Sequence, residues 1–326
     1  MQPYDGTVPD HTTTGELFQR YPENPILTAE RWPYPCNAVF NPAAARLPGG
    51  ETVLVVRVED HTGASHLTVA RSQDGFTAWD IDASPTLVSD PERPEERWGL
   101  EDPRVVWIDE LERFALTYTA YSEDGPLVAL ALTEDFKTFE RRGAIMPPDD
   151  KNAALFPRRF GERWLLFHRP MSARPGQHAH VWASFSPDLK HWSDPCSVLR
   201  TREAFSWDYV RAGLGPPPLE TPEGWLLIYH GVRTTVSGDI YRVGMALLDL
   251  ENPCRVIRRG EAWVLGPRAP YERIGDVPNV VFPCGQVYDE ESGELRLYYG
   301  AADTSVAVAT AQLSDLLQWL QDEGRN

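Results

Sequence analysis

The sequence predicts an all-β fold, a five-bladed β-propeller with short helices at its two ends. A strand–turn–strand pattern recurs five times at a spacing of roughly fifty to sixty residues, within the range typical of propeller blades. Short apolar runs are separated by Gly, Pro and Asp turns, and long helical periodicity is absent. A β-sandwich or a pair of β domains is the structural alternative.

Each predicted unit begins with a strongly apolar run of strand length. These runs cover residues 52–58, 114–120, 164–168, 225–229 and 295–299. In three units a second strand follows, and it leads through an acidic turn into an aromatic segment. These segments are residues 69–79, 129–139 and 182–192, with weaker copies at 244–250 and 306–311. The blades therefore occupy approximately residues 35–310.

The two ends of the chain carry signals for short helices. Thr14 is a candidate cap for a helix over residues 16–20, and Ser314 is one for a helix over residues 315–321. No Pro- or Gly-rich linker divides the chain, so residues 1–326 are expected to form one catalytic domain.

Composition excludes several classes of function. The net charge of −17 disfavours nucleic acid and anionic membranes as partners. Residues 1–20 lack the apolar core of a signal peptide, and no apolar run reaches transmembrane length. The cysteines are far apart in sequence and form no CxxC pair, so we expect neither a zinc site nor a disulfide framework; they are Cys36, Cys196, Cys254 and Cys284. These features favour a reducing, cytoplasmic location.

The segment Gly99-Leu-Glu-Asp-Pro-Arg-Val-Val106 is the strongest candidate for catalytic chemistry. Val105 begins a strand, which places Glu101 and Asp102 on the loop before it, close to Arg104. An arginine beside a carboxylate shifts the carboxylate pKa, as general acid or base catalysis requires. The alternative is a capped turn with a surface ion pair.

Further polar groups stand at the ends of equivalent strands. If the units are propeller blades, these ends converge on one face; the residues are Arg57, Asp60, Arg169, His230 and Asp303. A basic set of Lys151, Arg169, Arg211 and His230 suits an oxyanion such as phosphate. Taken singly, each group also has a structural explanation: a turn pair for Arg57 and Asp60, a core histidine for His168, a rigid turn for residues 213–218. Walker, GxGxxG, GxSxG and HExxH motifs are absent from the sequence.

Taken in order, these motifs resemble glycoside hydrolase family 130, the β-mannoside phosphorylases and related β-mannosidases. The matching segments are Arg-Val-Glu-Asp at 57–60, Glu-Asp-Pro-Arg at 101–104, Phe-Pro at 156–157, His-Arg-Pro at 168–170, Gly-Leu-Gly-Pro-Pro-Pro at 213–218 and Tyr-His-Gly-Val at 229–232. The resemblance extends from about residue 41 to residue 309. The family's five-bladed propeller agrees with the number of repeats.

The resemblance implies a glycosyltransferase-type phosphorylase (EC 2.4.1). Phosphate attacks a terminal β-mannoside with inversion and releases α-mannose 1-phosphate and a shortened acceptor. The family's catalytic acid matches Asp102, which is proposed to act through a sugar hydroxyl. An inverting hydrolase needs a second carboxylate to activate water, whereas phosphate is already a nucleophile.

The resemblance also implies the binding residues. Mannose contacts match Asn41, Arg57, Asp60 and Asp303, and phosphate contacts match Lys151, Asn152, Arg169, Arg211, His230 and Tyr241. At Lys151 and Asn152 the family often has arginine. No metal or organic cofactor is implied, and the expected partners are a manno-oligosaccharide or other β-mannoside and phosphate. The alternatives are a phosphate-independent β-mannosidase and a non-catalytic sugar-binding propeller. Linkage (β-1,2 or β-1,4), acceptor sugar and oligomeric state stay open, a homo-oligomer included.

Overall fold

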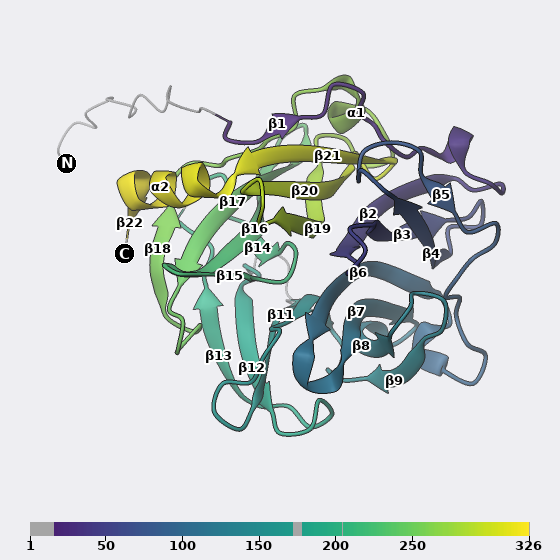
Figure 1. Cartoon of the computed structure of the whole chain (residues 1–326), viewed down its shortest axis with the longest axis horizontal. Helices are drawn as coiled ribbons and strands as arrows, with labels where there is room; N and C mark the ends of the chain where they lie inside the picture. Colours follow the sequence, from purple (N-terminus) through teal and green to yellow (C-terminus); the bar gives the residue numbers. More distant parts are fainter. Residues whose placement is uncertain (1–15, 172–177, 204, 326) are drawn as a thin grey trace.

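The computed structural model describes residues 16–171, 178–203 and 205–325, and these are almost entirely β-structure. Figure 1 shows antiparallel sheets grouped around one centre, with β2, β6, β14 and β19 nearest the middle. Contacts pass from β2 to β6, on to β10 and β14, and through β16 and β17 to β19, which contacts β2 again. The sheets therefore form a closed cycle.

The first sheet has eight strands and consists of two antiparallel halves. One half contains β2 (Ala38–Arg46), β3 (Thr52–Glu59), β4 (Ser65–Ser72) and β5 (Asp80–Ile81). The other contains β6 (Gly99–Ile108), β7 (Arg113–Ser122), β8 (Gly125–Thr133) and β9 (Glu140–Ala144). A single parallel bridge between Ser65 and Gly99 joins them. A Cβ on Gly99 would lie 2.5 Å from the Ser65 carbonyl oxygen, so only glycine permits this approach.

The remaining described strands form three sheets. The second contains β10 (Asp150–Leu155), β11 (Trp164–Pro170), β12 (Val181–Ser186) and β13 (Ser193–Leu199). The third contains β14 (Arg211–Leu214), β15 (Leu219–Thr221), β16 (Gly224–Thr235), β17 (Gly238–Leu248), β18 (Val256–Gly260) and β22 (Gly324–Arg325). The fourth contains β19 (Val281–Asp289), β20 (Glu294–Ala301), β21 (Ser305–Gln312) and β1 (Gln19–Arg20).

Helices are short and peripheral in the described part of the chain. They are η1 (Ala29–Arg31), η2 (Pro94–Glu96), η3 (Asp109–Leu111), α1 (Pro270–Arg273) and α2 (Leu313–Glu323). The five apolar runs predicted as strands lie in β3, β7, β11, β16 and β20, which confirms their assignment.

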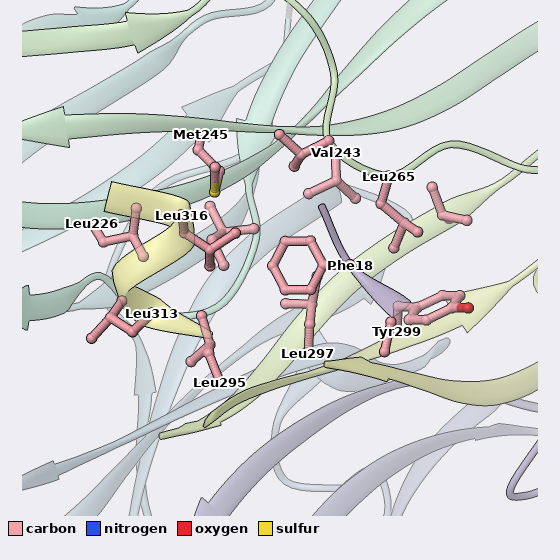
Figure 2. Close-up of a cluster of buried hydrophobic side chains, with 14 of the residues drawn as sticks. Phe18, Leu226, Val243, Met245, Leu265, Leu295, Leu297, Tyr299, Leu313 and Leu316 are labelled. Carbon is pink, nitrogen blue, oxygen red and sulfur yellow. The ribbon is translucent and has the colours of Figure 1, made fainter. Parts of the chain in front are cut away.

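The predicted helix over residues 16–20 is wrong, because this segment leads into a strand. Gln19 and Arg20 of β1 pair antiparallel with Thr310 and Ala309 of β21. Five residues are too few to offset the cost of helix nucleation. The side chain of Phe18 is instead buried among residues of β16, β17 and β20 (Figure 2). The proposed cap Thr14 lies outside the described residues.

The C-terminal helix is confirmed, but its cap is not Ser314. Helix α2 begins at Leu313, which places Ser314 in its first turn, and the N-cap residue Gln312 makes no side-chain capping bond. The helix packs through Leu313, Leu316 and Leu320 onto the same apolar cluster as Phe18 (Figure 2). Burial of this leucine face therefore determines where the helix lies.

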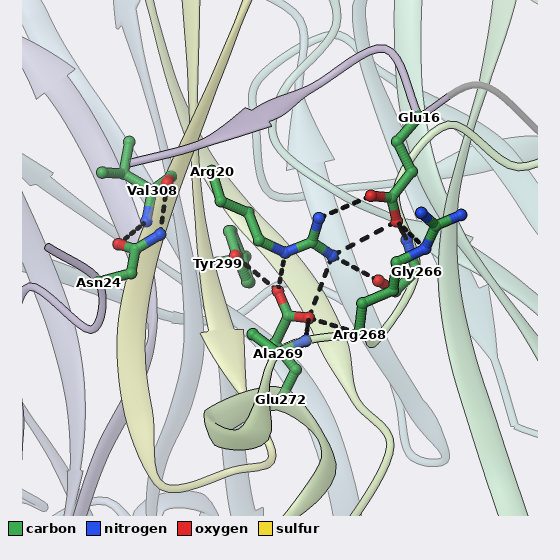
Figure 3. A network of polar contacts seen from close by, with 9 residues as sticks. All are labelled: Glu16, Arg20, Asn24, Gly266, Arg268, Ala269, Glu272, Tyr299 and Val308. Atoms are coloured by element: carbon green, nitrogen blue, oxygen red, sulfur yellow. Dashed lines mark hydrogen bonds and ion pairs between the residues drawn. The ribbon is translucent and has the colours of Figure 1, made fainter. Parts of the chain in front are cut away.

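A buried carboxylate of α1 fixes the N-terminal strand β1 to β20 and to the segment before α1 (Figure 3). Glu272 of α1 is fully buried, accepts a hydrogen bond from Arg20 Nε at 2.7 Å and another from the Tyr299 hydroxyl at 2.8 Å. Arg20 also bonds Glu16 at 2.7 Å and the Gly266 carbonyl at 2.6 Å. These contacts join the N-terminal end of the described chain to residues 266–299.

Candidate active site

Three of the innermost strands break register at one point, and each break presents an Asn or Asp with a positive φ. Asn41 in β2 has φ 47°, Asp102 in β6 has φ 48° and Asn152 in β10 has φ 54°. Asn and Asp tolerate this left-handed conformation, and a bulge redirects the side chain it carries. The acidic pair Glu101 and Asp102 therefore lies within β6, not on a loop before a strand as predicted.

The redirected side chains open into one cavity of about 700 Å³. Ten of the eleven predicted site residues line it: Asn41, Arg57, Asp102, Lys151, Asn152, Arg169, Arg211, His230, Tyr241 and Asp303. These residues come from every sheet, so the ends of equivalent strands meet on one face.

Asp60 is the predicted residue that the structure leaves out of the cavity lining. Its Oδ1 accepts hydrogen bonds from the Thr62 backbone N–H and hydroxyl, both at 2.7 Å, and from the Ala64 N–H at 3.1 Å. Asp60 thus holds the turn between β3 and β4, as aspartate commonly does in short turns.

The acidic side of the cavity is built around Asp102, which is 7% exposed. Its Oδ1 accepts from Asn41 Nδ2 at 2.8 Å and from Arg57 at 3.1 Å. Arg57 also bonds Glu101 at 3.1 Å and the Ser65 hydroxyl at 2.9 Å. Burial alone would raise the Asp102 pKa, but the positive charges of Arg57, Arg104 and Lys151 outweigh it and lower the pKa to about 2.

Asp303 is the second carboxyl group of the cavity, and its pKa is shifted upward, whereas that of Asp102 is shifted downward. It lies in the turn between β20 and β21, with φ 50°. Burial and the neighbouring Asp102 charge raise the pKa of Asp303 to about 7. Asp303 therefore holds a proton more readily than Asp102 does.

The basic side of the cavity gathers three cationic side chains. Arg169 is 5% exposed, and burial and the nearby Arg211 lower its pKa to about 10. With the Asn152 amide oxygen facing it, Arg169 donates from Nε and Nη2 at 3.2 Å. Burial also lowers the pKa of Lys151.

These cations are short of carboxylate partners. Arg211 bonds the Tyr241 hydroxyl at 2.9 Å and Asp239 at 3.0 Å. Among the described residues, neither Lys151 nor Arg169 lies within 4 Å of a carboxylate. One buried and one partly buried cation without such partners leave a positive potential that an anionic ligand would neutralise.

His230 belongs to this side of the cavity but is not a cation. It is 1% exposed, and its Nδ1 lies 3.1 Å from the Leu214 carbonyl oxygen, which can only accept. Burial and the Arg169 charge hold the His230 pKa well below its usual range. The imidazole is therefore neutral with its proton on Nδ1, which leaves Nε2 as a hydrogen-bond acceptor.

Arg104 is an organising residue of the site that was not selected from the sequence. It is 1% exposed and donates to the carbonyl oxygens of Asp102 at 2.5 Å, Gly215 at 2.9 Å and Leu214 at 3.2 Å. It thereby fixes the bulge of β6 against the end of β14. The sequence shows that Arg104 follows Asp102 and Pro103 in the motif, but it does not show that the side chain is buried.

His168 is a core residue, as its structural explanation predicted. Its Nδ1 lies 2.5 Å from Asp150 Oδ2 and its Nε2 lies 2.9 Å from the Ser184 hydroxyl. All three side chains are buried, and none of them lines the cavity. The array supports the strands that carry Lys151 and Arg169.

The mouth of the cavity is less polar. Met171, His178, Tyr209, Thr234 and Val277 line it. His178 packs edge-on against Tyr209, with ring centres 4.5 Å apart. Residues 172–177, which precede His178, lie outside the described part of the chain. In the described ranges we find no group of His, Cys, Asp and Glu able to hold a metal ion, and no helix long and apolar enough to cross a membrane.

Comparison with known proteins gives consistent matches. A family model described as beta-1,4-mannooligosaccharide phosphorylase matches residues 19–322. The chain is 33% identical over 312 residues to a beta-1,4-mannooligosaccharide phosphorylase of Ruminococcus albus, covering 94% of this chain and 91% of the relative. It is 36% identical to a beta-1,2-mannobiose phosphorylase of Listeria innocua, and the match covers 81% of this chain and 71% of the relative. The solved structure of a Listeria innocua beta-1,2-mannobiose phosphorylase with beta-1,2-mannobiose superposes with a TM-score of 0.84 at 30% identity. The match covers 94% of this chain and 99% of that structure's chain.

Proposed function

Because the chain belongs to glycoside hydrolase family 130, we propose that it is a β-mannoside phosphorylase. It transfers a terminal β-mannosyl group to inorganic phosphate with inversion and releases α-mannose 1-phosphate and a shortened acceptor. The observation that carries this proposal is the pairing, across one cavity, of the partly buried Lys151 and the buried Arg169 with the carboxylate Asp102.

Phosphate occupies the basic side in this proposal. The guanidinium groups of Arg169 and Arg211 match phosphate oxygens with parallel hydrogen bonds, and Lys151 adds a point charge. The Tyr241 hydroxyl, already bonded to Arg211, is a further donor. His230 Nε2 accepts from a protonated phosphate oxygen or a sugar hydroxyl. An anion held here lies beside Asp102 and next to the mannose that Asn41, Arg57 and Asp303 bind.

Asp102 acts as the acid, and phosphate binding prepares it for that role. Before phosphate binds, the surrounding cations lower its pKa to about 2, so the group is ionised. A bound phosphate offsets those cations, including Lys151, and raises the Asp102 pKa. Asp303, with a pKa of about 7, holds a proton in the same cavity. Proton uptake by Asp102 is thus coupled to binding of the nucleophile, and the proton passes through a sugar hydroxyl to the glycosidic oxygen.

We further propose that the architecture is a five-bladed propeller and a single catalytic domain of residues 1–326. Counting the two halves of the eight-stranded sheet separately gives five sheets around one centre. Sites at the mouth of such a centre are common for small ligands. The reaction needs no cofactor besides phosphate as co-substrate. It takes place in the cytoplasm, since an anionic sugar phosphate does not cross a bilayer unaided.

The test is a set of β-1,2- and β-1,4-linked manno-oligosaccharides incubated with and without phosphate. Both linkages are needed because the relatives differ in linkage. Mannose 1-phosphate formed only in the presence of phosphate supports the proposal. Free mannose formed at the same rate without phosphate favours the hydrolase alternative, and binding without turnover favours a sugar-binding module.

A further inference from the structure

Two cysteines that are distant in sequence meet at the junction of the second and third sheets. Cys196 lies in β13, and Cys254 lies in the turn between β17 and β18. Their sulfur atoms are 3.0 Å apart, although 58 positions separate the residues. Spacing along the chain alone gave no reason to expect a disulfide here. The two remaining cysteines, Cys36 and Cys284, are buried elsewhere.

The backbone holds both sulfur atoms in place. Cys196 stands opposite Ala183 in the pairing of β12 with β13. The turn of Cys254 is fixed by Asp249, whose Oδ1 accepts from the N–H groups of Glu251 at 3.0 Å and Asn252 at 2.9 Å. Both cysteines pack against the apolar cluster shared by the two sheets and are only partly buried. The contact thus follows from well-packed structure, and small oxidants can reach it.

We propose that Cys196 and Cys254 form an oxidisable dithiol, whose disulfide covalently joins the second and third sheets. The two thiols lose two protons and two electrons as one S–S bond forms. The oxidant is a low-molecular-weight disulfide, which accepts the electrons and leaves as two thiols through a mixed-disulfide intermediate. The sulfurs need to approach by only about 1 Å from their present separation.

We expect the Cys196–Cys254 disulfide to change the stability of the fold and not the catalytic rate. It closes a loop of 58 positions, which restricts the unfolded chain. For a chain of this length we expect the melting temperature to rise by about 5 °C. Cys254 follows the C-terminal end of β17, whereas Tyr241 of the cavity lies near its N-terminal end. Burial and the neighbouring Cys196 raise the Cys254 pKa to about 12, so oxidation is slow at neutral pH and faster in alkali.

The experiment compares full-length protein equilibrated with oxidised glutathione or with dithiothreitol. Thiols are titrated after denaturation, and non-reduced peptides are identified by mass. The reduced protein has four thiols, and the oxidised protein should retain two, with one cross-linked peptide pair. Cys196→Ser and Cys254→Ser should each form no intramolecular cross-link and show no rise in melting temperature upon oxidation. Cys36→Ala is the matched control and should still cross-link.

Four free thiols in the oxidised wild type, or separate glutathione adducts without a cross-link, would overturn the proposal. A cross-link involving Cys36 or Cys284 would also overturn it. These readouts do not require turnover, so their failure is distinct from failure of the phosphorylase proposal.

Discussion

Replacing Asp102 by asparagine tests the acid role with little disturbance of the backbone. Asparagine has the shape of aspartate and tolerates the φ of 48° found here, whereas alanine adds roughly 1 kcal/mol of strain in this conformation. The introduced amide still accepts a hydrogen bond from Asn41 or Arg57 but cannot deliver a proton. We expect turnover to fall by about 10²- to 10⁴-fold, the usual contribution of general acid catalysis.

The structural cost of this change should be modest. Removing one partner of a buried ion pair typically costs about 3–5 kcal/mol because the other charge is left unpaired. Arg57 is not left unpaired, since it retains Glu101 at 3.1 Å and the Ser65 hydroxyl at 2.9 Å. The loss should therefore be about 1.5–3 kcal/mol, that of one hydrogen bond to a charged group. Asp102→Ala should melt at a lower temperature than Asp102→Asn.

The assay is the initial rate of mannose 1-phosphate formation from a manno-disaccharide at saturating phosphate. A second substrate, an aryl β-mannoside whose leaving group needs no protonation, separates proton donation from positioning. Asp102→Asn should lose far less activity on the aryl substrate. Near-normal rates on the disaccharide, or equal losses on both substrates, would refute the assignment of Asp102 as the acid.

Further predictions concern the basic side, the second carboxyl group and metal dependence. Arg169→Ala and Arg211→Ala should raise the KM for phosphate at least tenfold and that for the mannoside much less; equal effects would contradict a phosphate site. Gly213→Ala should also impair phosphate use, because its Cβ would lie 2.5 Å from His230 Cε1 and 3.0 Å from Arg169 Nε, whereas Gly49→Ala, with open space around it, should be neutral in the same kinetics. Burial raises the pKa of Asp303 to about 7, so ionising this group costs folding free energy as pH rises from about 4 to 7. Asp303→Asn should therefore gain melting temperature relative to wild type across that range, and a constant difference would argue against the shift. Activity should survive dialysis against a chelator, and restoration of lost activity by a divalent ion would contradict this.

The sequence predicts the strands that form uninterrupted apolar runs and misses most of those that polar residues or glycine interrupt. The runs now seen in β3, β7, β11, β16 and β20 are apolar and regular, which is why they were recognised. The innermost strands contain bulges and residues such as Asn152 and Gly213, so most of them lack a long apolar run. The prediction of a helix near Arg20 was wrong because the segment's conformation depends on distant residues. Gln19 pairs with Thr310, and Arg20 bonds Glu272.

The site was predictable where topology alone brings residues together. Equivalent strand ends meet on one face, and four of the five residues predicted from this argument line the cavity: Arg57, Arg169, His230 and Asp303. Asn41, Asn152 and Tyr241 were predicted only from the resemblance to the family. The protonation states were not predictable, because the neutral His230 depends on the Leu214 carbonyl and on its burial. The sequence placed Arg104 beside Asp102, but its bonding role was not predictable for the same reason: a charged residue is expected at a surface, and only the folded structure shows the three carbonyls it joins.

The pairing of β1 with β21 also determines when the N-terminal strand can fold during translation. Gln19 leaves the ribosome early, but its partner Thr310 is made about 290 residues later, which at 5–20 residues per second takes roughly 15–60 s. For most of that interval β20 and Glu272 have not been made, so Phe18 has no partner from β20 and Arg20 has none in Glu272. The cycle of sheets therefore closes only near the end of translation. We expect nascent chains arrested before residue 270 to be cut by protease between β1 and β2, and released full-length protein to resist cleavage there.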